Sequence, residues 1–246
     1  MIGRALRAQA RVARGDVVLL GLAVAAVALS ATLATSIPAG LAAAPPDVRR
    51  ELAAPFDAVL ATYAGMLAAV YGSFRYTIDQ RDGVIAQRLM LQSRWATLAV
   101  RVPASAVGGA VVALAAVGGG RSALALAMGG IPVVPSAVVA TLALGAAAAL
   151  WGLGLGIIIR AHLAALFLVA LSMGVAVVLA AIASPVAVFL PLLAGLQAFG
   201  FDVTAVGVAP GAGLAQGVAG MIAGGWLLLA LGAGGALFLR RDVTSG

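Results

Sequence analysis

The stretch that decides the fold is AVVATLALGAAAALWGLGLGIII, residues 137–159, followed after Arg160 by AHLAALFLVALSMGVAVVLAAIA, residues 161–183. Neither run contains Asp, Glu, Lys or Arg, and each is long enough for a helix that crosses the hydrocarbon core of a bilayer. A helix satisfies its backbone hydrogen bonds internally, which an apolar surrounding demands. Two such runs separated by one arginine therefore predict two consecutive membrane-spanning helices.

The rest of the chain has the same character. Hydrophobic residues make up 63% of the 246 residues, charged residues only 9%, and the mean hydropathy is +1.15, whereas a soluble domain carries about 25% charged residues. Four further apolar runs cover residues 17–37, 56–74, a stretch from between 96 and 102 to 118, and 216–239. We predict an all-α integral membrane protein with six transmembrane helices in a single domain, residues 17–246.

The arginines predict the orientation of these helices. All 15 basic residues are arginine, and the loops alternate between the two sides of the membrane, so twelve arginines fall on one side. Only Arg49, Arg50 and Arg121 fall on the other side. Cytoplasmic loops carry the excess of positive charge, so both termini are predicted to be cytoplasmic. Richness in Arg, Ala, Gly and Pro is typical of a GC-rich bacterial genome and predicts a bacterial plasma membrane.

The N-terminal segment, residues 1–16, is predicted to form an amphipathic helix on the membrane surface. Four arginines at helical spacing share one face of this segment, and Ala, Leu and Val fill most of the remainder. Such a face is attracted to anionic lipid. The simpler alternative, that the arginines only set the topology, stays open. The four residues are Arg4, Arg7, Arg11 and Arg14.

One apolar segment does not have the length of a normal span. Residues 185–200 are interrupted by Pro185 and Pro191, and an apolar run of this length is typical of a re-entrant or interfacial segment. We expect an external re-entrant segment between the fifth and sixth spans, followed by a loop over residues 200–213. A seventh span is the alternative.

The highest density of charge lies between the second and third spans, in residues 71–94. We expect this stretch to be a cytoplasmic loop, with a polar break at Asp82-Gly83 and then an apolar stripe of Val84, Leu91 and Trp95. Such a segment presents charge and an apolar ridge to something in the cytoplasm. An ordinary solvated loop would have the same composition.

The order of these segments resembles that of the permease subunits of type-2 ATP-binding-cassette (ABC) exporters over nearly the whole chain. In that family the loop after the second span carries a charged stretch and then a short coupling helix that docks on the ATPase subunit. Asp79-Gln-Arg-Asp-Gly83 is similar to that stretch, although the family usually has glutamates at the acidic positions and a proline near Gln92. The resemblance implies that residues 84–94 form the coupling helix. The ATPase contacts it implies are Asp79, Arg81, Asp82, Gly83, Val84, Arg88, Leu91 and Arg94.

The resemblance also implies a function. The chain would export a hydrophobic or amphipathic substrate (a drug, lipid or antibiotic) as a dimer of identical or related permeases, in contact with membrane lipid and not with nucleic acid. A P-loop requires a lysine that reaches the phosphates, and this sequence contains no lysine. The ATPase is therefore expected to be a separate subunit that binds ATP and Mg²⁺. We expect no cofactor in this chain.

Enzyme and carrier functions are less compatible with the sequence. There is no cysteine and one histidine, His162, so a metal site or a catalytic constellation is not expected. Asp57 and Arg101 lie near the ends of predicted spans, where their side chains can reach the interface, which disfavours a proton-driven carrier. A carrier that works alone and a non-transporting scaffold remain the alternatives. Glycines such as Gly152 and Gly224 predict close helix packing.

Overall fold

The computed structural model describes residues 15–33, 44–128 and 134–240, and every regular element in these ranges is a helix. Four of the helices are long and apolar enough to cross a membrane. They are residues Arg94–Ala127, Pro135–Ile159, His162–Ala187 and Gln216–Arg240. The predicted all-α, multi-pass membrane protein is thus confirmed. The number of six crossings and their orientation remain predictions.

The described helices include one long helix for each predicted apolar run, with two short α-helices and one 3-10 helix between them. Of the first run, residues 34–37 lie outside the described residues, as do Arg4, Arg7, Arg11 and Arg14 of the predicted surface helix. The elements are α2 (Val17–Thr32), α3 (Pro46–Arg81), α4 (Val84–Leu91), α5 (Arg94–Met128), α6 (Pro135–Ile159), α7 (His162–Ala187), α8 (Pro191–Ala198), the 3-10 helix η3 (Val203–Val206) and α9 (Gln216–Arg240).

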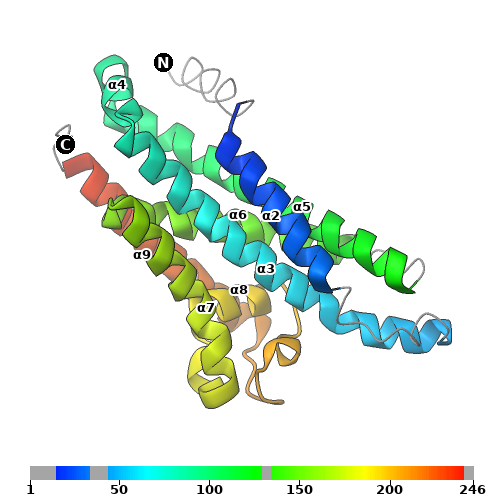
Figure 1. The fold of residues 1–246 in the computed structure, drawn as a ribbon. Helices are drawn as coiled ribbons and strands as arrows, with labels where there is room; N and C mark the ends of the chain where they lie inside the picture. The colour runs from blue at the N-terminus through cyan, green and yellow to red at the C-terminus, as the bar shows by residue number, and fades with distance from the viewer. Residues whose placement is uncertain (1–14, 34–43, 129–133, 241–246) are drawn as a thin grey trace.

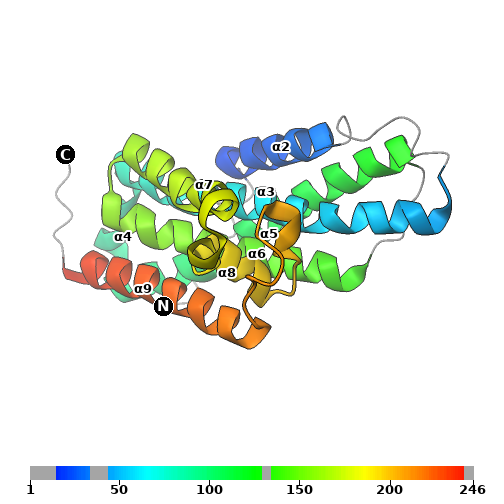
Figure 2. The same cartoon turned by 90° about the horizontal axis from the view of Figure 1, so that it is seen from below.

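The long helices run back and forth along one bundle (Figure 1). The start of α2, the end of α3, the short helix α4 and the end of α9 gather at one end, which we call the α4 end. The opposite ends of α2, α3 and α5 lie together at the far end. Seen from below, α8 occupies the angle between α7 and α9 (Figure 2). Alternating directions of this kind agree with helices that cross a membrane in sequence.

The centre of the bundle is the packing of α3 against α6. Gly72 of α3 faces the backbone of Ala149, and Gly152 of α6 faces the backbone of Ala69, so that a Cβ atom at either glycine would overlap a carbonyl oxygen. Small residues allow this close approach of two helices. The packing role predicted for Gly152 is confirmed, whereas a Cβ atom at Gly224 of α9 would meet no atom of the described residues within 4 Å.

The proline-broken segment after α7 is folded back against the bundle. The backbone of Ala183 is non-helical (φ −142°, ψ 59°), which puts a kink just before Pro185. The chain then turns and forms α8, whose residues Leu192–Gln197 are buried. At eight residues α8 is too short to span a bilayer. This geometry agrees with a re-entrant segment, and the seventh span has no helix of sufficient length.

Candidate functional site

The α4 end contains a chain of buried charges, which begins on α3. The sequence predicted residues 71–94 to be a cytoplasmic loop, but α3 continues as a helix to Arg81. The prediction was wrong for residues 71–81, which are helical, and the charged side chains of Arg75 and Asp79 in these turns face other helices of the bundle. Arg75 and Asp79 are one helical turn apart and form an ion pair with each other, as residues at this spacing do.

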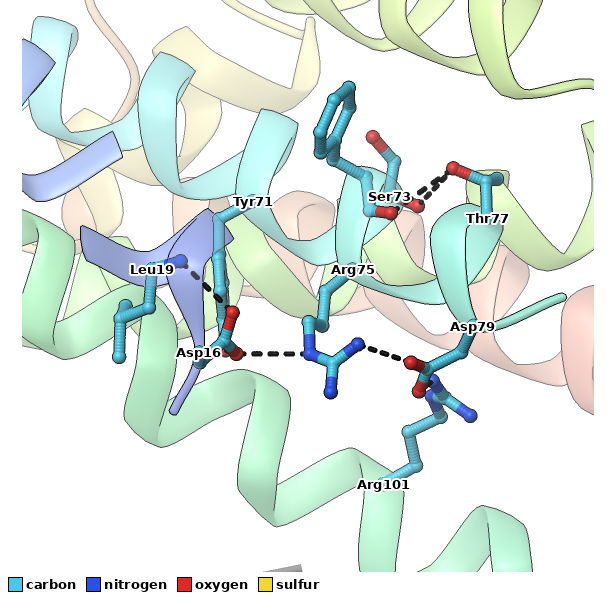
Figure 3. Close-up of polar contacts among 9 residues, drawn as sticks. Asp16, Leu19, Tyr71, Ser73, Arg75, Thr77, Asp79 and Arg101 are labelled. Atoms are coloured by element: carbon cyan, nitrogen blue, oxygen red, sulfur yellow. Dashed lines mark hydrogen bonds and ion pairs between the residues drawn. The ribbon is translucent and has the colours of Figure 1, made fainter. Parts of the chain in front are cut away.

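The first partner of this segment is Asp16, at the start of α2. The Oδ1 atom of Asp16 accepts a hydrogen bond from the backbone N–H of Leu19 at 3.1 Å, so it caps α2. The Oδ2 atom accepts from Nε of Arg75 at 2.9 Å and from the Tyr71 hydroxyl at 3.2 Å. One carboxylate thus fixes the start of α2 and binds it to α3 (Figure 3).

The second partner is Arg101 of α5, which pairs with Asp79 from the side opposite Arg75 (Figure 3). The side chains of Asp79 and Arg101 are each only 4% exposed. The guanidinium of Arg101 also lies over the ring of Tyr76, 5.1 Å from its centroid, at the distance of a cation–π contact. Arg101 was expected to reach the membrane interface, and it is directed into the bundle instead.

Asp16, Arg75, Asp79 and Arg101, which we call the charge chain, alternate in sign and join α2, α3 and α5. Two acids and two bases balance, so burial leaves no excess charge when all four are ionised. Breaking a buried pair leaves an uncompensated charge and is strongly destabilising. Ionisable residues inside a helical membrane bundle are rare and are default candidates for function. The charge chain therefore fixes the geometry of the three helices beside α4.

The turn after the charge chain depends on glycine. The backbone N–H of Asp82 donates to the carbonyl of Ile78 at the end of α3. Gly83 follows with φ +70°, ψ 5°, the left-handed conformation that glycine adopts without steric cost. Helix α4 begins at Val84 and ends at Leu91, and Gln92 is extended. A short helix is therefore present between the second and third long helices, but it ends at Leu91, whereas the prediction extended it to residue 94, which belongs to α5.

One face of α4 is anchored in the bundle. Ile85 is 2% exposed and packs in an apolar cluster with Tyr76, Leu153, Ile157 and Phe238, from α3, α6 and α9. The burial of one isoleucine side chain stabilises a protein by about 1.5–3 kcal/mol. Helix α4 is thus attached through this cluster to α3, α6 and α9, and a displacement of α4 would be felt by these three helices.

The outer face of the α4 segment is exposed and apolar at its tip. Met90 and Leu91 are each 85% exposed and Trp95, in the first turn of α5, is 66% exposed. Arg81 and Asp82, which precede the start of α4, are exposed as well. We call Met90, Leu91 and Trp95 the α4 tip. Exposed large apolar side chains that occur together in a short segment are typical of a protein interaction site.

A second attachment joins this segment to α9. The guanidinium Nη1 of Arg94, the first residue of α5, donates to the carbonyl of Leu239 at 3.0 Å. The last carbonyls of a helix have no partner within the helix and are good acceptors for a cation. Arg94 therefore fastens the end of the α4 segment to the end of α9.

The predicted ATPase-contact residues consequently fall into three groups. Arg81, Asp82 and Leu91 are exposed, Gly83, Val84, Arg88 and Arg94 are partly buried, and Asp79 is inside the bundle. Sequence reasoning did not single out Asp16, Ile85 or Met90. An aspartate directly before an apolar run, as Asp16 is, is an N-cap signal. Its partners on α3 could not be predicted, because they are more than fifty residues away in the sequence.

The other predicted residues lie apart from the charge chain. Asp57 of α3 pairs with Arg121 of α5 at 2.5 Å, where the side chains are 25% and 14% exposed. His162 approaches the Thr77 hydroxyl through Nδ1 at 2.9 Å and lies against the ring of Phe74. In the part of the chain that the structure describes, no group of three His, Cys, Asp or Glu side chains could hold a metal ion.

Comparisons with known proteins place no further constraint on this site. No protein-family model, curated protein or solved structure matches the chain.

Proposed function

We propose that this chain is the membrane-spanning permease subunit of an ABC exporter in a bacterial plasma membrane. In this proposal six helices (α2, α3, α5, α6, α7 and α9) cross the bilayer, both termini are cytoplasmic, and the α4 end faces the cytoplasm. A separate subunit binds ATP and Mg²⁺ and hydrolyses the nucleotide. The exported substrate is hydrophobic or amphipathic, and the permease works as a dimer of identical or related chains.

The observation that supports this proposal is the construction of α4. Its tip is exposed and apolar, and its opposite face is anchored through Ile85 to α3, α6 and α9. A partner that binds Met90, Leu91 and Trp95 would therefore bind a short helix that is already packed against three long helices. Rigid-body shifts of helices transmitted in this way are a common form of coupling.

The ATPase is expected to be retained when the chain is purified from its native membrane in mild detergent or nanodiscs. The variant Leu91→Asp places a charge in the apolar tip and should abolish retention of a P-loop protein. Leu126→Asp is the matched control, because Leu126 is 89% exposed near the opposite end of α5. The proposal is wrong if the unmodified chain retains no ATPase in either medium, or if both variants behave alike.

A carrier that works without an ATPase is the second candidate, and one observation favours it. Asp79 and Arg101 are buried within long helices, and buried carboxylates form the proton paths of many carriers. This candidate predicts that the lone chain, reconstituted in liposomes, transports a substrate in response to a pH gradient. It also predicts that Leu91→Asp leaves that transport unchanged.

A further inference from the structure

An apolar cavity of about 310 Å³ lies between α6, α7, α8 and α9, away from both the charge chain and the α4 tip. Its walls include Leu144 and Trp151 of α6, Met173 of α7, Leu192 of α8 and Trp226 of α9. No charged residue lines it. Pockets that hold small molecules have volumes of about 300–1,000 Å³, so this cavity has the size of a ligand site.

The polar groups of its two largest side chains are directed to protein partners. The indole N–H of Trp151 donates to Oγ of Ser172 at 3.2 Å, and that of Trp226 donates to the carbonyl of Phe189 at 2.8 Å. The two rings meet edge to face, with centroids 5.7 Å apart. A water molecule in a cavity needs several polar partners. With both indole donors already bonded, the cavity favours an apolar occupant.

The α9 wall of the cavity is kept open by glycine. Gly220 and Gly224 both line it, and a Cβ atom at either position would meet no atom within 4 Å. The first carbon of a side chain at these positions would therefore enter free space and would not meet another helix.

The α8 wall is held in place by Gln197. Its Nε2 atom donates to the carbonyl of Leu193 at 2.9 Å, and its Oε1 atom accepts from the backbone N–H of Leu214 at 2.5 Å. The first bond lies within α8, and the second joins α8 to the chain that leads into α9. The cavity thus has an α8 wall held by side-chain hydrogen bonds and an α9 wall in which two glycines leave space beside Trp226.

We propose that this cavity binds the hydrocarbon chain of an amphiphile that reaches it from the membrane. An apolar cavity without free polar groups binds apolar molecules rather than water. The chain could belong to a bilayer lipid or to a freely exchanging amphiphile, such as a fatty acid. Binding requires no ATPase partner; only its role as the substrate site rests on the proposed function.

Tryptophan fluorescence can report on binding in the cavity. The sequence has three tryptophans, and two of them, Trp151 and Trp226, line the cavity. The variant Trp95→Phe removes the third, which is at the α4 tip. In nanodiscs of phosphatidylcholine, a brominated fatty acid should then quench the remaining fluorescence saturably. A second arm uses brominated phosphatidylcholine as the bilayer itself, without fatty acid.

Filling the cavity tests the assignment. In the Trp95→Phe background, Gly224→Leu should weaken fatty-acid quenching by roughly tenfold in apparent affinity. Gly232→Leu is the control, because Gly232 is also on α9, faces open space and does not line the cavity. Gly220→Leu serves in its place if Gly224→Leu does not purify as a monodisperse protein.

The two arms identify the source of the chain. Saturable quenching by the fatty acid that Gly224→Leu weakens assigns the cavity to an exchanging amphiphile. Quenching that only brominated phosphatidylcholine produces, and that Gly224→Leu reduces, assigns it to a bilayer lipid. The proposal is overturned if Gly224→Leu and Gly232→Leu give equal quenching in both arms. The purified chain is used alone, so loss of the ATPase interaction would not affect this result.

Discussion

Asp79, in the last turns of α3, and Arg101, two turns into α5, form an ion pair in which each side chain is 4% exposed. Arg75 binds the same carboxylate and also forms an ion pair with Asp16. The end of the bundle beside α4 is therefore held by charge, whereas its centre is held by close packing of small residues.

Asp79→Asn should lower the stability of the protein strongly. It leaves Arg101 and Arg75 facing a neutral amide inside the bundle, and removal of one partner from a buried pair costs about 3–5 kcal/mol. The double variant Asp79→Asn/Arg101→Gln removes one charge of each sign and should recover part of the loss. Unfolding in detergent checks this double-mutant cycle. Additive losses in the double variant would contradict a direct interaction.

Asp16 has two roles that two substitutions can separate. Asp16→Asn keeps an oxygen that can cap α2 but removes the charge that binds Arg75. Asp16→Ala removes both and should cost about 1 kcal/mol more, the usual contribution of an N-cap. Hydrogen exchange at the first turns of α2 measures the difference. Equal protection in the two variants would show that the cap contributes nothing.

Close packing of α3 on α6 predicts intolerance of one added carbon. Gly152→Ala would force its Cβ atom into the carbonyl of Ala69 and should lower the thermal unfolding midpoint in detergent by several degrees, since about 1 kcal/mol shifts the midpoint of a domain of this size by roughly 2–4 °C. Gly118→Ala is the control, because a Cβ there meets nothing within 4 Å. A neutral Gly152→Ala would mean that α3 and α6 can separate without loss.

Truncation of a side chain on the anchored face of α4 should lower the stability of the protein, whereas truncation on the exposed face should not. Ile85→Ala opens a cavity in the cluster with Leu153 and Phe238, and should destabilise the protein by about 2–5 kcal/mol. Leu91→Ala removes an exposed side chain and should leave stability unchanged within about 0.5 kcal/mol. Detergent unfolding of the two variants tests this difference. Equal stability would show that α4 is not fastened to the bundle.

Part of this structure follows directly from the sequence, because hydropathy and backbone signals are local. The apolar runs on either side of Arg160 predict α6 and α7 almost to their ends, and Asp82-Gly83 predicts the break between α3 and α4. Charge is interpreted less reliably. Hydropathy assigns Arg75 and Asp79 to a solvated loop, because it contains no information on partners that lie far away in the sequence.

The burial of Arg101 and the role of Asp16 could not be predicted for the same reason. The burial of these charges becomes favourable only when α2, α3 and α5, from three parts of the chain, bring the paired side chains together. The cavity between α6 and α9 likewise depends on the kink at Ala183 and the position of α8, neither of which follows from composition. Glycine spacing alone could not distinguish Gly152, which packs against α3, from Gly224, whose Cβ position meets no atom of the described residues within 4 Å.

The charge chain also has a consequence for biosynthesis. Translation proceeds from the N-terminus, so Asp16, Arg75 and Asp79 are made before Arg101, and the first two long helices together carry one unbalanced negative charge among these residues. That charge is compensated only when Arg101 of α5 has been synthesised. Helices α2 and α3 therefore cannot bury these charged side chains without α5. A ribosome-bound intermediate that ends before α5 should be the stage at which the nascent chain depends most on the insertion machinery.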